Sequence, residues 1–208
     1  KLDGKKSWFL PFNKGYNGGA GNPPNPTGIK TDYLWKEIFH KYELANIIEN
    51  YAQVIEETDE DTKKKTYKQV FPRYHQLAAV KALLKDAKEK GTGQKYLIQH
   101  SAGSGKSNSI AWTAHQLVGL EQNGKNILTD RVNLDKQIKN TIKQFMQVSN
   151  TVGHAEHSGD LRRFIAHGKR IIITTVHKFP FILDEMGNEH KGNNFAIIID
   201  EAHSSQSG

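Results

Sequence analysis

The sequence contains no cysteine, and this absence excludes disulfide bonds and metal sites built from thiolates. It also contains no uninterrupted apolar run that approaches the ~20 residues a helix needs to span a bilayer. We therefore expect neither a disulfide-stabilised extracellular domain nor a protein that enters or binds a membrane.

The remaining composition is that of a basic globular protein. Hydrophobic residues make up 36% and charged residues 25% of the 208 positions, enough for one well-buried domain with an extension. Lysine and arginine number 29 against 22 acidic residues, which leaves a formal net charge of +7. A basic surface suits a polyanionic partner, because phosphates attract lysine and arginine and release counterions on binding. Many globular proteins are basic, so charge alone favours nucleic acid only slightly.

Three regions follow one another along the chain. Residues 1–31 include the stretch "FNKGYNGGAGNPPNP", whose glycines and prolines disfavour a helix or a central strand, and we interpret this region as a linker. Residues 32–70 regain apolar residues at helical spacing, which predicts one or two helices followed by a charged segment at 56–65. That segment is predicted to be a solvated turn or a strand hairpin. Residues 71–208 alternate between helical and strand patterns.

The third region has the pattern of an α/β domain with a parallel sheet. Helices are predicted at 74–90, 106–120, 133–146 and 161–168, and strands at 95–100, 126–130, 170–176 and 194–200. The strands are continuous apolar runs, which is typical of a sheet covered by helices on both faces. Ligands in such sheets bind beyond the carboxyl ends of the strands.

A phosphate-binding loop follows the strand predicted at 95–100. The sequence "GSGKS" lies between that strand and a helix, which is the context a P-loop requires. Its glycines allow backbone N–H groups to surround a phosphate, and the helix dipole attracts the negative charge. The predicted phosphate-binding residues are Gly103, Ser104, Gly105, Lys106 and Ser107. Lys106 is expected to reach the β- and γ-phosphates of a nucleoside triphosphate, and the hydroxyl of Ser107 to ligate Mg²⁺.

An acidic pair follows the last apolar strand, in the sequence "IIIDEAH". Asp200 is predicted to hold Mg²⁺ through its water shell, and Glu201 to polarise the attacking water as general base. A buried strand with a polar exit is an ordinary feature by itself. Together with Lys106, however, the pair predicts a catalytic site for nucleoside triphosphate hydrolysis.

The letters DEAH resemble motif II of superfamily-2 helicases and translocases. That resemblance suggests a function for the segment "FPRYHQ", which lies upstream of the phosphate-binding loop. In the superfamily this position often carries an adenine-reading element. The amide of Gln76 offers a donor and an acceptor to the adenine edge, and Arg73 or an aromatic ring can stack on the base. The alternative is a helix start at which Gln76 is merely exposed.

Two further strand ends, in "LTDRVNLDKQI" and "IITTVHKF", occupy the positions of the nucleic-acid-contacting motifs of the superfamily. Their polar residues are predicted to contact the DNA backbone without reading bases. These residues are Thr129, Arg131, Thr174 and Thr175. Without the acidic motif, strand-end caps and a surface charge would be the better interpretation of the same four residues.

Several longer segments are similar to the motor (R) subunit of type I restriction–modification enzymes, a superfamily-2 DEAH-type translocase. They include "PFNKGYNGGAGNPPNPTGIKTDYLWKEIF", "YLIQHSAGSGKSNSIAW" and "FAIIIDEAHSSQSG", and in order they cover nearly the whole chain. His100 stands where the general P-loop pattern has glycine, and histidine is usual there in this family. The resemblance implies a RecA-like P-loop parallel sheet with helices on both faces, the first motor lobe, preceded by a linker and a short helical extension.

The same resemblance implies cofactors, partners and missing parts. ATP and Mg²⁺ are the expected cofactors, and the expected partners are double-stranded DNA and the methyltransferase and specificity subunits, in the cytoplasm of a bacterium or archaeon. In this family a nuclease domain precedes the linker and a second motor lobe follows the DEAH motif. We therefore expect a fragment that binds nucleotide weakly, hydrolyses it slowly and does not cut DNA.

Three alternatives stay open at this point. The chain could be the first lobe of another DEAH-type helicase that acts on RNA or DNA, or a P-loop ATPase unrelated to nucleic acid. It could also be a scaffold that keeps the fold without catalysis, although Lys106, Ser107, Asp200 and Glu201 are all intact. Stimulation of ATP hydrolysis by DNA would distinguish a motor that acts on DNA from a P-loop ATPase unrelated to nucleic acid and from a scaffold without catalysis.

Overall fold

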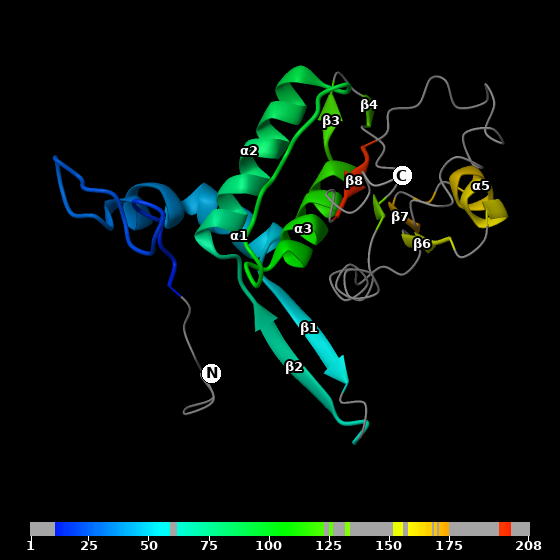
Figure 1. Ribbon diagram of the computed structural model, residues 1–208, viewed down its shortest axis with the longest axis horizontal. Helices are drawn as coiled ribbons and strands as arrows, with labels where there is room; N and C mark the ends of the chain where they lie inside the picture. The colour runs from blue at the N-terminus through cyan, green and yellow to red at the C-terminus, as the bar shows by residue number, and fades with distance from the viewer. Residues whose placement is uncertain are drawn as a thin grey trace. The chain divides into compact units, whose positions relative to one another are not determined.

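The structure, a computed structural model, describes residues 11–58, 62–122, 125–126, 132–133, 152–155, 158–167, 169, 171–174 and 196–200. The chain divides into two compact units, Lys1–Ala79 and Val80–Gly208. The first unit contains the π-helix η2 (Leu34–Ile38), the helix α1 (Lys41–Asn50), the strands β1 (Gln53–Thr58) and β2 (Lys65–Val70), and the start of the helix α2 (Tyr74–Lys90). The second contains the rest of α2, the helices α3 (Lys106–Val118) and α5 (Ser158–Ala166), and several short strands (Figure 1).

The glycine-rich stretch of the first unit forms a tight antiparallel turn. Asn17 and Gly18 have φ values of +48° and +74°, and a type I′ hairpin turn requires positive φ at both central residues. Tyr16 and Gly19, on either side, exchange two backbone hydrogen bonds of 3.0 Å. The Asn-Gly pair therefore gives this segment a local fold of its own, while its role as a linker between domains stays a prediction.

Two helices follow this stretch, as the apolar spacing predicts. His40 separates η2 from α1, and its φ and ψ of −62° and 137° are extended, so the first helix cannot continue through it. Ile38, Ile47 and Tyr51 are buried, and the last two have no exposed surface. Ile47 and Tyr51 are one helical turn apart, so α1 buries one face in the core of the first unit.

The strands β1 and β2 form an antiparallel hairpin, which confirms one of the two structures predicted for the charged segment. Their register runs from Gln53 opposite Val70 to Thr58 opposite Lys65. Ile55 is buried, whereas Val54 and Tyr67 are 60% and 70% exposed. Lys65–Gln69 of β2 are exposed on both faces of the strand, so among these side chains Ile55 is the one that packs and most of the hairpin is open to water.

The helix α2 spans Tyr74–Lys90, which is the predicted range. Its buried residues Leu77, Val80 and Ala87 lie on the stripe expected for an amphipathic helix. The helix ends at Gly91, whose φ of +74° is left-handed and whose N–H donates a 2.9 Å hydrogen bond to the carbonyl of Ala87. A glycine in this conformation is the usual residue after a helix C-terminus.

Four short strands of the second unit form a parallel sheet. The strands are β5 (Val132–Asn133), β6 (Val152–His154), β7 (Ile171–Thr174) and β8 (Ile198–Ile199), in the order β6-β7-β5-β8. The three isoleucines of β7 are at most 1% exposed, as expected for an inner strand of a parallel sheet. Strands β3 (Glu121–Gln122) and β4 (Lys125–Asn126) form a separate antiparallel pair. This mixture of helices and strands confirms the α/β class.

The prediction of a strand at 95–100 is wrong. These residues have no regular secondary structure, and Tyr96, Leu97 and Ile98 are 43%, 86% and 42% exposed. A strand persists only through ladder hydrogen bonds to a neighbour, and none of the strands that the structure describes pairs with this segment. The hydroxyl of Tyr96 instead donates a 2.9 Å hydrogen bond to Asp86, which attaches the segment to α2.

Two predictions are wrong where they are described: Asn133, predicted to begin a helix, lies in strand β5, and Asn126, predicted to begin a parallel strand, lies in the antiparallel pair β3–β4. The remaining predicted elements agree with the structure to within a few residues where they are described. Helix α3 ends two residues before the predicted end at 120, and α5 begins three residues before the predicted start at 161. Strands β7 and β8 lie inside the strands predicted at 170–176 and 194–200. Most of the strand predicted at 126–130 and of the helix predicted at 133–146 lies outside the described residues. Among the helices that are described, none has the length and apolar character needed to cross a membrane.

Candidate nucleotide-binding site

A glycine turn opens α3 and contains the predicted phosphate loop. Gly103 and Gly105 have φ values of +71° and +84°, a region that other L-residues rarely adopt. Gly105 is the N-cap of α3, and the N–H of Ser104 donates a 3.3 Å hydrogen bond to the carbonyl of Ser101. A β-carbon added at Gly103 would meet no atom within 4 Å, so the backbone conformation, rather than crowding, requires glycine there. The space beside the turn is therefore open.

The helix behind this turn is firmly packed. Lys106 and Ser107 are its first two residues and are partly exposed. The residues Ala111, Trp112, Ala114 and Leu117 are each at most 4% exposed and form its buried face. The hydroxyl of Thr113 adds a 2.8 Å hydrogen bond to the carbonyl of Ser109. Burial of this face holds the helix start in place, and the helix dipole puts partial positive charge beside Lys106.

A second turn brings the predicted adenine-reading residues together at the start of α2. The N–H of Arg73 donates a 2.8 Å hydrogen bond to Oε1 of Gln76, and the carbonyl of Arg73 accepts the N–H of Leu77 at 3.0 Å. Arg73 is thus the N-cap and Gln76 the third helical residue, which is one half of a capping box. The alternative prediction of a helix start is therefore confirmed, whereas the exposure that it gave to Gln76 is wrong, because this side chain is only 3% exposed.

Aromatic side chains from the N-terminal stretch pack around this turn. The ring of Phe12 lies 6.4 Å from that of Phe71 and 5.7 Å from that of Tyr74, and Tyr33 meets Tyr74 edge to face at 5.4 Å. The hydroxyl of Tyr33 donates a hydrogen bond to the carbonyl of Phe12. Sequence reasoning missed these contacts, because no local pattern relates residues that are so far apart along the chain.

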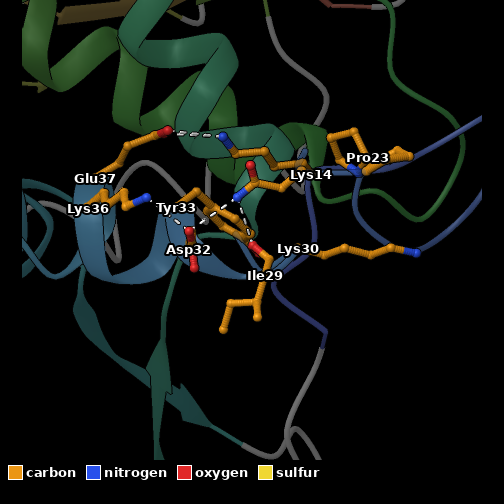
Figure 2. Close-up of a pocket in the computed structure, with 10 residues that line it drawn as sticks. Lys14, Pro23, Ile29, Lys30, Asp32, Tyr33, Lys36 and Glu37 are labelled. Carbon is orange, nitrogen blue, oxygen red and sulfur yellow. Dashed lines mark hydrogen bonds and ion pairs between the residues drawn. The ribbon is translucent and has the colours of Figure 1, made fainter. Parts of the chain in front are cut away.

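Lys14 lies among the same rings. Its ammonium is 4.7 Å from the centre of the Tyr33 ring and 5.6 Å from that of Tyr74, and it forms a 3.1 Å ion pair with Glu37 (Figure 2). Burial by itself would lower the pKa of Lys14, but the hydrogen bond to Glu37 and the attraction of Tyr74 and Glu37 together raise the pKa. We name the group Phe12, Lys14, Tyr33, Glu37, Phe71 and Tyr74 the aromatic cluster.

A cavity of about 320 Å³ lies beside Lys14, between the proline stretch and η2 (Figure 2). Pro23, Pro24 and Tyr33 provide apolar parts of its wall. Its charged residues include Asp32, whose carboxylate lies 2.9 Å from the ammonium of Lys36. The hydrogen bond from Lys36 lowers the pKa of Asp32. This cavity was not predicted from the sequence.

The remaining predicted site residues lie at strand ends or outside the described part of the chain. Asp200 directly follows β8 and is partly exposed. Thr174 is the last residue of β7 and is paired in register with Asn133 of β5. Glu201, Thr129, Arg131 and Thr175 lie outside the described residues. The structure therefore brings together the residues of the glycine turn and, separately, the Arg73–Gln76 turn, and convergence of these turns with Asp200 stays a prediction.

Comparison with known proteins defines the class. The family model of the SWI2/SNF2 ATPase matches residues 75–208, and the chain belongs to this family. More particularly, it is related to the endonuclease subunits of type I restriction enzymes, as the sequence motifs predict. Two such subunits from Staphylococcus aureus strains are each 30% identical to it over 174 residues, which is 80% of this chain and 17% of theirs. The HindI endonuclease subunit of Haemophilus influenzae is 32% identical over 164 residues, which is 72% of this chain and 15% of that subunit.

Proposed function

We propose that this chain binds ATP with Mg²⁺ and contacts the DNA backbone, as part of a motor that hydrolyses ATP to move double-stranded DNA. The observation that carries the proposal is the turn at 103–107, whose two left-handed glycines open α3. Such a turn presents backbone N–H groups to a phosphate without β-carbons in the way. Membership of the SWI2/SNF2 ATPase family supports ATP as the nucleotide.

The groups available in the chain fit a magnesium triphosphate. Lys106 offers an ammonium for the β- and γ-phosphates, while Ser107 and Asp200 offer the hard oxygen ligands that Mg²⁺ prefers. When bound, the metal would neutralise charge on the phosphates. We assign Glu201 as the general base that polarises the attacking water, so that Lys106, Asp200 and Glu201 are the proposed catalytic residues.

The adenine base is proposed to lie against the turn at the start of α2. Oε1 of Gln76 already accepts the N–H of Arg73, but a carbonyl oxygen has a second lone pair that can accept from the exocyclic amine of adenine. The amide of Gln76 can donate to the base, and the guanidinium of Arg73 can stack on it. The hydrogen bond from Arg73 holds the side chain of Gln76 in one orientation, and a fixed side chain discriminates between bases better than a mobile one.

As part of this proposal, we assign residues 71–208 to the first lobe of a motor, with a RecA-like α/β fold. The parallel order β6-β7-β5-β8 supports it, because a larger parallel sheet with helices on both faces would contain such a core. In this proposal residues 1–31 link the lobe to a nuclease domain and residues 32–70 form a helical extension. The residues assigned to the DNA backbone are Thr129, Arg131, Thr174 and Thr175.

The names of the relatives support a place in a type I restriction complex. We propose that the protein carrying this sequence is its motor and endonuclease subunit and acts with methyltransferase and specificity subunits in a prokaryotic cytoplasm. This chain spans 17% of the length of the Staphylococcus aureus relatives. The nuclease centre and the second motor lobe of such a subunit are therefore assigned to residues outside this chain.

Equilibrium binding tests the nucleotide site. In the complete protein that carries this sequence, Lys106→Ala should weaken binding of ATP with Mg²⁺ about tenfold or more, because a charge-assisted phosphate contact is lost. Lys85→Ala removes an exposed lysine of α2, whose side chain is 76% exposed, and should leave affinity unchanged. Equal affinity of the Lys106→Ala variant and the parent would contradict the proposed site.

A further inference from the structure

Tyr33 links the N-terminal stretch to the start of α2 by two contacts. Its ring meets the ring of Tyr74, and its hydroxyl bonds to the carbonyl of Phe12. Only 6% of Tyr33 is exposed, and this burial raises the pKa of its hydroxyl. A buried tyrosine with its hydroxyl bonded is a fixed side chain, so it can transmit the position of one segment to another.

Phe12 contacts two aromatic residues of the turn directly. Its ring touches both Phe71 and Tyr74, which are the residues on either side of Pro72 and Arg73. Edge-to-face and tilted ring pairs at these distances are favourable beyond the apolar area they bury. The backbone that presents Arg73 and Gln76 is thus flanked by side chains held by residues from another part of the chain.

Lys14 adds a charge to the same contact. Its ammonium is attracted by the faces of the Tyr33 and Tyr74 rings and is paired with Glu37 of η2. Cation–π contacts contribute more when they are shielded from water, and the side chain of Lys14 is 26% exposed. The ion pair joins the glycine-rich stretch to η2, and the contact with the Tyr74 ring joins it to the first turn of α2.

We propose that Phe12, Lys14 and Tyr33 are positioning residues for base recognition, which hold the turn from Phe71 to Gln76 in the geometry that selects adenine. This inference rests on the proposed function, in which Gln76 and Arg73 read the base. Phe12, Lys14 and Tyr33 act through the backbone and side chains of the turn and do not contact the nucleotide in this scheme. Loss of the cluster therefore weakens recognition of the base and leaves recognition of the phosphates intact.

Binding of two probes by the complete protein that carries this sequence separates these effects. The probes are ATP with Mg²⁺ and inorganic tripolyphosphate with Mg²⁺, which has the phosphates of ATP and no base. Tyr33→Ala and Lys14→Met should each raise the Kd of ATP about three- to tenfold and leave the Kd of tripolyphosphate unchanged. Tyr33→Phe keeps the ring and removes the hydroxyl, so it should cause a smaller rise in the same direction. Tyr42→Ala, at a 71% exposed position of α1, is the matched control and should change neither Kd.

The outcomes distinguish this inference from the function on which it rests. If the parent binds ATP no more tightly than tripolyphosphate, the positioning role falls together with the proposed reading of adenine by Gln76 and Arg73, while the phosphate site at 103–107 is tested separately by Lys106→Ala. If Gln76→Ala removes the preference for ATP but Tyr33→Ala and Lys14→Met keep it, the positioning role alone is wrong. An equal loss of affinity for both probes would also overturn it, because that is the effect of general destabilisation. If Tyr33→Ala fails to fold, Tyr33→Phe and Lys14→Met test the positioning role by the ratio of the Kd of ATP to the Kd of tripolyphosphate.

Discussion

The backbone N–H of Arg73 donates a 2.8 Å hydrogen bond to the side-chain oxygen of Gln76, three residues further along the chain. This bond makes Gln76 part of the helix cap, and the same amide is the group proposed to read adenine. Structure and recognition therefore depend on one buried side chain. A mutation at this position affects both, and a pair of variants is needed to separate the two effects.

Gln76→Ala should lower the free energy of unfolding by about 1–2 kcal/mol, because the N–H of Arg73 loses its acceptor. Gln76→Glu keeps an acceptor oxygen at a helix N-terminus, where negative charge is favoured, and should regain part of that loss. Neither variant has the amide donor, so both should lose the preference for ATP over tripolyphosphate. Urea denaturation and equilibrium binding measure the two effects. A Gln76→Glu protein with full ATP preference would contradict the role of the amide.

Substitutions at Gly103 should follow backbone conformation rather than side-chain size. A β-carbon finds open space there, but the φ of +71° costs an ordinary L-residue about 1–2 kcal/mol. Asparagine adopts this conformation more readily, so Gly103→Asn should be less destabilised than Gly103→Ala, and Gly103→Val should be the worst. Thermal unfolding of the three variants gives the order. A ranking by volume, with alanine the mildest, would contradict a left-handed Gly103.

His115 of α3 makes the stability of the protein depend on pH. Burial lowers the pKa of its imidazole below the ordinary value of 6.5, because the charged form is poorly solvated. The unfolded chain then binds the proton more readily, so this contribution to stability is fully present above pH 6.5 and is lost as the pH falls through the lower pKa of the folded state.

Replacement of His115 by glutamine should therefore flatten the acid side of the stability profile. Denaturant unfolding at a series of pH values between about 5 and 8 measures the slope. His40→Gln, at an exposed position between η2 and α1, is the control for the loss of one histidine. An unchanged slope in His115→Gln would contradict the burial of this side chain.

Two glycines of the second unit form a matched pair. A β-carbon on Gly153 of β6 would lie 2.7 Å from the ring of Phe164 of α5, so Gly153→Ala should cost about 1–3 kcal/mol by overpacking. A β-carbon on Gly159, in the first turn of α5, meets nothing within 4 Å. Gly159→Ala should therefore be neutral or stabilising by up to about 1 kcal/mol. Chemical denaturation of both variants tests whether α5 packs on β6 as described, and equal effects would contradict it.

The parts of the fold that the sequence predicts well are those with local causes. Helix α2 has an apolar stripe through Leu77 and Val80 and a glycine at its end, and both signals are contained within the helix and its flanks. The glycine turn before α3 is equally local, because Gly103 and Gly105 supply conformations that other residues avoid. These features could be placed to within a residue or two.

The features that sequence reasoning missed depend on distant partners. The apolar run at 95–100 has the composition of a strand, but composition does not report whether a neighbouring strand pairs with it. Phe12, Tyr33 and Tyr74 meet across long separations in the chain, so no periodicity connects them. For the same reason Gln76 could be assigned to a helix start, yet its burial could not be predicted from the sequence.

The most direct test of the central claim is the rate of ATP hydrolysis by the complete protein that carries this sequence, assembled with its partner subunits, with and without duplex DNA. We predict hydrolysis that duplex DNA stimulates, and a Lys106→Ala protein that loses this stimulation while the assembled complex still recognises its DNA site. Hydrolysis that is indifferent to DNA, or that survives in Lys106→Ala, would contradict the assignment of the glycine turn to an ATP-driven motor that acts on DNA.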